Sequence, residues 1–232
     1  ERICPAEAIA SGAGIDSQRC YGCGRCLPAC PHGLIEEQDH RLPPDSVVEL
    51  LLAIRPDAVE IHTAPLHDQA FAALVLSLAQ AAVPLRRLAV SCGLEGHGGD
   101  EAQLVRALWH RHGCLRSAGF RPLWQLDGKP MSGDVGPGTA RAAVRLWRTI
   151  RAKAPPGPLQ LAGGTNASTV ELLEPRERPA GIAYGGVARR LMMPLLQEAQ
   201  ERGCPLRAWP EGWDQALALA IPLVTPWVDR SC

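Results

Sequence analysis

Four cysteines lie close together near the start of the chain, at the spacing C-x2-C-x2-C-x3-C, and a proline follows the last of them. They are Cys20, Cys23, Cys26 and Cys30. Ferredoxin-type loops use this spacing to hold iron–sulfur clusters through thiolates. Zinc sites usually space their thiolates as two separated pairs, so zinc and a chance grouping are the weaker interpretations. The spacing predicts a ligand loop for a 4Fe-4S cluster.

A second Cys-Pro pair, at Cys4, resembles the pair at Cys30, since a short turn and an apolar segment follow each. In two-cluster ferredoxins the cysteine before the proline binds the other cluster. By this pseudo-symmetry we expect Cys4 to be the fourth ligand of the first cluster, beside the first three cysteines of the run. Cys30 is then expected to belong to a second cluster. The alternative is that Cys4 is a lone buried thiol.

The remaining ligands of that second cluster are missing from the sequence, and we expect them upstream of Glu1. The chain opens on Glu rather than Met and shows no targeting pattern, so the expectation is a fragment of a longer polypeptide. A second iron–sulfur cluster is accordingly expected only in the full-length protein.

Composition excludes several classes of protein. Lys plus Arg equals Asp plus Glu, at 24 each, so no overall charge recruits nucleic acid or acidic lipid. Of nine cysteines, five lie in the cluster motifs and the others are scattered, which favours a reducing, cytoplasmic location over a disulfide framework. The most apolar stretch, 216–228, contains two prolines and is too short to span a bilayer.

Beyond the cysteines, short β-type runs alternate with helical patterns. The expected strands are 58–62, 87–91, 122–126, 159–162 and 181–184, and the expected helices are about 66–81, 100–117, 139–153, 167–173 and 187–202. Alternation of this kind predicts a parallel sheet. We interpret it as a partial (β/α)8 TIM-type barrel with a ferredoxin-like 4Fe-4S insertion module, and a doubly wound sheet is the alternative. The expected domains are the iron–sulfur module at 1–45, the half-barrel at 46–204 and a C-terminal tail at 205–232.

Polar residues gather where the expected strands end, which in a barrel is the mouth that carries the chemistry. They are Glu60, His62, Thr63, Ser91, Cys92, Gln125, Asp127, Asp134, Thr165, Asn166 and Tyr184. The alternative is that these residues have only structural roles. A strand-end histidine often does no more than form a hydrogen bond, and Asp beside Gly often only forms a turn. No nucleophile with a matching base is identified, so the catalytic residues are unknown.

Two glycine pairs end the last two strands, where many barrels bind phosphate. Gly163, Gly164, Gly185 and Gly186 are therefore expected to border an anion or cofactor site, and FMN would fit there. Glycine-rich joints in βα units are more often simple turns.

Four segments together resemble the LdpA family, the light-dependent period proteins of cyanobacteria. They are 19–31 with the cysteine run, 125–134, 160–166 and 181–186. The resemblance extends nearly end to end. It implies an iron–sulfur protein that senses cellular redox state and relays light and electron-transport conditions to the circadian clock, with clock input kinases as protein partners. It implies no established catalytic residues.

Three functions from different classes remain as hypotheses. The first is a redox sensor or electron-transfer relay, which is not an enzyme. The second is an iron–sulfur flavoenzyme, an FMN-dependent oxidoreductase on a TIM barrel. The third is a structural barrel whose cluster only holds the insertion together.

Overall fold

The computed structural model describes the whole chain except residues 1–2, 5, 21, 39–41, 130–137 and 232. The described residues form two compact units. The sheet unit comprises 42–129 and 138–183. The cysteine unit comprises the described residues of 3–38 together with 184–231, and a hydrogen bond from Gln200 Nε2 to Gln18 Oε1 at 3.1 Å joins its two segments.

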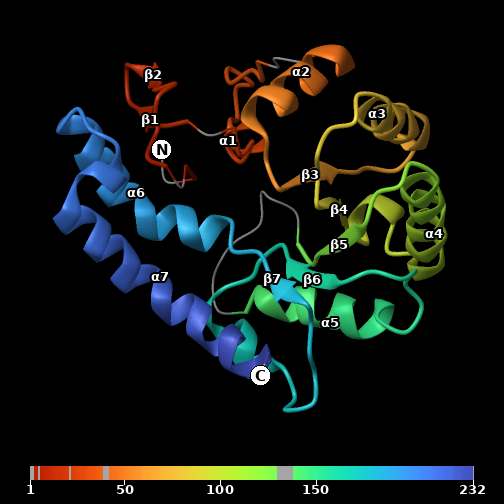
Figure 1. Ribbon diagram of the computed structural model, residues 1–232. Helices are drawn as coiled ribbons and strands as arrows, with labels where there is room; N and C mark the ends of the chain where they lie inside the picture. Colours follow the sequence, from red (N-terminus) through yellow and green to blue (C-terminus); the bar gives the residue numbers. More distant parts are fainter. Residues whose placement is uncertain (1–2, 5, 21, 39–41, 130–137, 232) are drawn as a thin grey trace. The chain divides into compact units, whose positions relative to one another are not determined.

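The sheet unit contains five parallel strands that pair in chain order (Figure 1). They are β3 (Ala58–His62), β4 (Arg87–Cys92), β5 (Pro122–Asp127), β6 (Leu159–Ala162) and β7 (Gly181–Ile182). The sequence pattern predicts the start of every strand correctly. β3 and β7 are the two edges of the sheet among the described residues.

Helices connect these strands and begin within two residues of the predicted positions. They are α3 (Asp68–Gln80), α4 (Glu101–Ser117) and α5 (Ala140–Ile150), with short 3-10 helices η1 (Glu95–His97) and η2 (Ala167–Leu172) in the connections. Asp100 begins α4 because its carboxylate accepts backbone N–H groups of Ala102 and Gln103 at 2.8 and 3.1 Å. The sequence pattern did not predict α2 (Pro44–Ile54), which precedes β3.

The connecting helices lie on one side of the sheet. Crossovers between parallel strands share one hand, so a strand order that never reverses places every crossover helix on the same face. α2, α3, α4 and α5 contact one another in succession, as Figure 1 shows. β5 alternates accordingly: Trp124 and Leu126 are fully buried, whereas Gln125 and Asp127 point to the opposite face and are only partly buried.

One of the two predicted architectures needs correction. The strand order does not reverse about a central strand, so the doubly wound alternative is wrong. The described sheet is open, as a partial barrel would be, but its two edges leave membership of a TIM-type barrel unshown. The fold that is established is mixed α/β with an open five-stranded parallel sheet.

The cysteine unit begins with a small antiparallel pair, β1 (Ile9–Ala10) and β2 (Gly14–Ile15), followed by the short helix α1 (Cys26–Ala29). Its second segment contains α6 (Gly186–Glu201), η3 (Leu206–Ala208) and α7 (Pro210–Ser231). α6 and α7 pack through a small buried cluster of Leu195, Ala199, Trp209 and Ala216.

The sequence pattern predicts a tail at 205–232, and the described part of it, residues 205–231, is mostly helical. α7 continues through Pro222 and Pro226 although each proline removes one backbone hydrogen bond. Packing of its first turns against α6 stabilises the helix where it starts. Among the described helices, none combines the length and apolar character needed to cross a membrane.

Candidate metal centre

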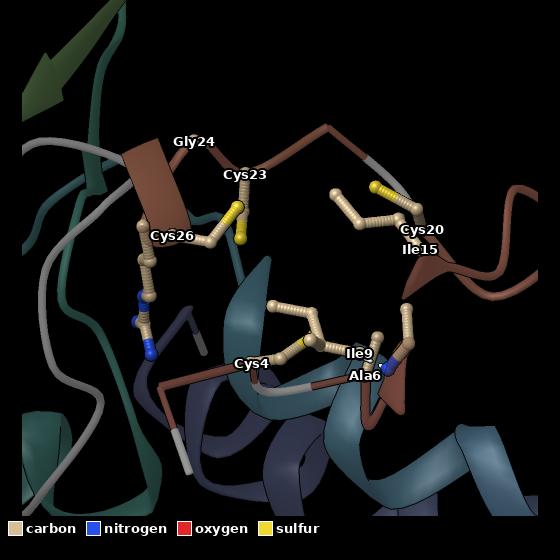
Figure 2. Close-up of a pocket in the computed structure, with 10 residues that line it drawn as sticks. Cys4, Ala6, Ile9, Ile15, Cys20, Cys23, Gly24 and Cys26 are labelled. Atoms are coloured by element: carbon tan, nitrogen blue, oxygen red, sulfur yellow. Dashed lines mark hydrogen bonds between the residues drawn. The ribbon is translucent and has the colours of Figure 1, made fainter. Parts of the chain in front are cut away.

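Four cysteines from two separate segments surround one pocket in the cysteine unit. Figure 2 shows Cys4 approaching from one segment and Cys20, Cys23 and Cys26 from the other. Ala6, Ala8, Ile9, Ile15, Gly24 and Arg25 complete the described lining. The pocket has a volume of about 340 Å³, including the part open to solvent. Donors able to act as thiolates thus stand in a largely apolar wall.

Local backbone geometry explains why the cysteine run curves around this pocket. Gly22 and Gly24 have φ of +70° and +72°, a region that residues with a Cβ rarely adopt. Before the run, the Asp16 carboxylate accepts the N–H of Gln18 at 2.9 Å, and its carbonyl accepts the N–H of Cys20 at 2.9 Å. These turns fix the path of the backbone that leads to Cys20.

Cys4 and Cys30 have the same local geometry, as the pseudo-symmetry of the two Cys-Pro pairs predicts. The N–H of the residue four positions later donates to each thiol, at 3.2 Å for Cys4 and 3.4 Å for Cys30. The N–H three positions later donates to each carbonyl, at 3.3 and 3.2 Å. The residue at that third position has positive φ in both cases, +51° at Glu7 and +61° at Gly33.

Cys30 differs from Cys4 in its place. Cys4 lines the pocket, and Cys30 is not among the described residues that do. Hydrogen bonds from backbone N–H groups, led by that of Leu34, lower the pKa of Cys30. Such bonds favour the thiolate, which is the form that binds metal.

The donor set fits an iron–sulfur cluster in its chemistry. The four cysteines of the pocket are free thiols, and none of them forms a disulfide. In the described part of the chain, no three His, Cys, Asp or Glu side chains are close enough together to bind one metal ion. The four sulfurs therefore line the pocket but do not surround a single-ion site. A cluster presents a separate iron to each thiolate ligand.

A second polar site lies on the face of the sheet opposite the helices. Strand register places four polar residues from four neighbouring strands in one transverse row: His62, Ser91, Gln125 and Gln160. Two hydrogen bonds link side chains on this face, from Gln125 Nε2 to Glu60 Oε1 at 2.8 Å and from Gln160 Nε2 to Gln125 Oε1 at 3.1 Å. The strand-end residues of β3, β4 and β5 therefore do come together.

His62 lies at the centre of this polar group. Its Nδ1 is hydrogen-bonded to Ser91 Oγ at 2.5 Å and lies 3.9 Å from Asp127 Oδ2 and 4.0 Å from Glu60 Oε1. Burial raises the pKa of Asp127 to about 6, against the opposing effects of His62 and of a hydrogen bond from Ser91. The Asp127 carboxyl therefore keeps its proton to a higher pH than an ordinary aspartate does.

The other predicted mouth residues have local structural roles or lie elsewhere. Thr63 Oγ1 donates to the Ser91 carbonyl at 2.6 Å, and Thr165 Oγ1 donates to the Ala183 carbonyl. Asn166 begins η2 by accepting the N–H of Ser168 at 3.0 Å. Tyr184 belongs to the cysteine unit, where its hydroxyl accepts the indole N–H of Trp227 at 2.7 Å. Asp134 lies outside the described residues.

The first glycine pair has a packing reason. At Gly163 and Gly164 φ is +67° and +80°, and a Cβ would lie 2.4 Å from the Lys129 carbonyl oxygen and 3.0 Å from that of Thr139. These backbones approach too closely for any side chain. Gly185 and Gly186 begin α6, and their proposed anion role stays a prediction, as does that of the first pair.

Two arginines were missed by the sequence reasoning. Arg25 lines the cysteine pocket, and its position in the sequence, directly before Cys26, was the signal for this. Arg111 is 1% exposed and occupies an apolar position of α4, in the stripe Leu104, Leu108, Arg111 and Leu115. The spacing of three and four residues was a signal that could have identified Arg111, since a charged residue rarely takes a core position without a reason.

Comparison with protein families gives two matches that divide the chain. Residues 50–226 match the Light dependent period A C-terminal domain, and residues 1–41 match the LdpA Fe-S cluster-binding domain. The second match contains all five cysteines of the two motifs.

One curated relative is Light dependent period A of Synechococcus elongatus (strain ATCC 33912 / PCC 7942 / FACHB-805). It is 41% identical over 232 residues, which cover 97% of this chain and 64% of the relative. The chain thus spans less than two thirds of the relative's length. No solved structure matches the chain.

Proposed function

Because the chain belongs to the LdpA family, we propose that it binds a 4Fe-4S cluster through Cys4, Cys20, Cys23 and Cys26 and acts as a redox sensor in circadian clock input. The family match supports an iron–sulfur cluster, and the type of cluster and its ligands are our proposal. The observation that carries it is the pocket that these four cysteines share.

The fourth ligand is the specific part of this proposal. The cysteine run offers three thiols to the pocket, and Cys4 comes from a segment that the β1–β2 pair separates from it in sequence. The Ala8 N–H donates to its sulfur at 3.2 Å, which fixes the direction of the Cys4 side chain. We also propose Cys30 as a ligand of a second cluster.

When bound, the cluster supplies reversible one-electron transfer. The chain's residues determine how that change is sensed. Ile9 and Ile15 limit water on one side of the pocket, and Arg25 places a positive side chain at its lining. A change of one charge beside these groups alters their electrostatic interactions, and that is the physical basis of a sensor.

The proposed outputs are protein contacts with clock input kinases in the cytoplasm, by the resemblance to the family. A segment of a (β/α)8 barrel remains our interpretation of the sheet unit, since its strands run in chain order. No observation favours the flavoenzyme: the backbone approaches at Gly163 and Gly164 account for that pair without FMN.

Spectroscopy of anaerobically reconstituted protein tests the cluster. We expect iron and sulfide in the chain, broad visible absorption, and an electron paramagnetic resonance spectrum that changes reversibly on reduction. Cys23→Ser should lose these signals, and Cys114→Ser, whose thiol lies in α4 of the sheet unit, should keep them. A cluster that forms but cannot be reduced reversibly would exclude redox sensing and leave a structural role.

A chimera tests the link to the clock. This chain would replace the matching segment of the Synechococcus relative, with and without Cys23→Ser. We expect the wild-type chimera to preserve the dependence of circadian period on light intensity and the variant to lose it. Equal periods for the two chimeras at every light intensity would contradict a role for the cluster.

A further inference from the structure

Arg111 is a buried cation whose hydrogen-bonding capacity is mostly unused. Its side chain is 1% exposed, and among the described residues neither Nε nor Nη1 has a hydrogen-bond partner. Only Nη2 is engaged, by the Ala64 carbonyl at 3.3 Å and by Asp68 Oδ1 at 3.4 Å. Buried donors are almost always satisfied, and those of a charged group are especially costly to leave without acceptors.

The charge of Arg111 is also poorly balanced. Asp68 is the one carboxylate that pairs with it in the described structure, at 3.4 Å, and the Asp68 side chain is 45% exposed. Cys92 faces the guanidinium as a neutral thiol, because burial raises its pKa to about 12. Burial lowers the pKa of nearby His97, which favours its neutral form as well. A guanidinium in this setting lacks the close, two-pronged anion that it binds best.

The place of Arg111 is one where parallel α/β sheets bind ligands. Its contacts lie in the connection from β3 to α3, directly after the C-terminal end of β3. The N-terminus of α3 is beside it, and the residue before that helix, His67, provides no side-chain cap. Free backbone N–H groups at the start of a helix favour phosphate and carboxylate groups.

Two connections meet next to Ala64, whose carbonyl accepts from Arg111. The ideal Cβ of Gly96, in the connection after β4, lies 2.9 Å from Pro65 Cδ, so the two connections are in contact. Next to Pro65, Leu66 has φ of +66° and its side chain is 97% exposed. A bulky residue in this backbone region is strained, and its side chain gains no packing in return.

We propose that Arg111 anchors an oxyanion site, which takes a phosphate or carboxylate group between the β3–α3 and β4–α4 connections. The anion displaces the Asp68 carboxylate from the guanidinium and meets the N-terminus of α3. Asp68 holds the position when no ligand is bound. All of these residues lie in the sheet unit, so this proposal is independent of the cluster and of the proposed redox function.

Thermal unfolding with inorganic phosphate or acetate tests the site, with chloride at equal ionic strength as the reference. We expect Tm to rise with the logarithm of the anion concentration above Kd, by about 5–10 °C at roughly one hundred times Kd. The anion that gives the rise identifies the ligand class, and either one supports the site. Because phosphate also stabilises proteins nonspecifically, Arg111→Met is the control, and it should show only the nonspecific part of the rise in Tm.

Asp68→Asn should have the opposite effect on anion binding to Arg111→Met, and it tests the site independently of that variant. Removal of the competing carboxylate should tighten phosphate binding at least several-fold by isothermal titration calorimetry, although the variant without phosphate is less stable. A purely structural ion pair predicts no phosphate binding in either protein. If Arg111→Met fails to fold, the comparison of wild type with Asp68→Asn decides alone. Equal Tm shifts in wild type and Arg111→Met, or no tightening in Asp68→Asn, would overturn the proposal.

Discussion

Gly128 lies against the backbone of Ala143, at the point where the end of β5 meets α5. A Cβ at Gly128 would come within 2.1 Å of the Ala143 nitrogen and 2.4 Å of its Cα. Both obstacles are backbone atoms of a helix, so neither can turn aside as a flexible side chain would. The short distance between the strand and its helix therefore depends on glycine at this position.

Gly128→Ala should destabilise the sheet unit by about 1–3 kcal/mol or more, because α5 must move away from β5. The matched control is Gly113→Ala in the exposed face of α4, where a Cβ would meet nothing within 4 Å. That change should stabilise the protein by about 0.5–1 kcal/mol, since alanine favours the helix. Urea unfolding of both variants measures the difference, and a neutral Gly128→Ala would mean that the two elements are not so close.

Cys4→Ser and Cys30→Ser should have different effects although the two thiols share one local geometry. Cys4 lines the pocket and Cys30 is not among its described lining residues, so loss of Cys4 should reduce cluster absorbance and bound iron strongly. Cys30→Ser should leave the first cluster intact in this chain. Iron analysis and visible absorption after reconstitution measure both. Equal iron loss in the two variants would contradict the assignment of Cys4 as the fourth ligand.

Asp127→Asn should change the dependence of stability on pH. The folded pKa of Asp127 is about 6, above the ordinary value of 3.8, so the folded state disfavours the ionised carboxyl. The carboxyl adds no penalty below about pH 4, and the penalty grows as pH rises through 6. It reaches roughly 3 kcal/mol at most, at 1.36 kcal/mol for each pKa unit.

We therefore expect Asp127→Asn to be more stable than the wild type at pH 8 and close to it at pH 4. Urea unfolding at several pH values between these limits follows the difference. Asp57→Asn is the control, because its carboxylate pairs with Arg86 at the surface, where both side chains are mostly exposed. A stability difference for Asp127→Asn that does not depend on pH would contradict the raised pKa.

Glu177→Gln should be the most destabilising change among the ion pairs of the sheet unit. Both carboxylate oxygens of Glu177 accept hydrogen bonds from Arg148 at 2.7 Å, its side chain is 6% exposed, and the bond from Arg148 lowers its pKa to about 2. Breaking such a pair leaves a charge poorly compensated, so we expect a loss of about 2–4 kcal/mol.

Glu101→Gln provides the comparison, because Glu101 pairs with Lys153 at 3.2 Å and both side chains are about half exposed. An exposed pair contributes at most about 1 kcal/mol. Similar losses for the two variants in urea unfolding would show that the Arg148–Glu177 pair is no stronger than a surface pair.

The limits of the strands and helices could be predicted from the sequence better than the contacts between them. β-type runs such as 58–62 and 159–162 are short, apolar and bounded by turns, so their limits follow from local pattern. The row formed by His62, Ser91 and Gln125 did not follow, because register between strands depends on pairing over long distances. α7 was missed because two prolines usually end a helix, and the packing that sustains it is tertiary.

The same limit applies to the sites. Cys4 could be placed with the cysteine run because two Cys-Pro segments repeat each other in the sequence. Arg111 could not be interpreted in the same way, since its apolar stripe predicts burial but not the absence of acceptors around its nitrogens. That absence depends on how the β3–α3 connection folds over α4.

The composition of the two units has a consequence for synthesis on the ribosome. Each strand from β4 to β7 pairs with the strand translated just before it, so the sheet can form progressively as the chain emerges. The cysteine unit cannot, because the sheet unit lies in the chain between its first segment and the segment with α6 and α7. The pocket cysteines of its first segment therefore stay without α6 and α7 while the whole sheet unit is translated.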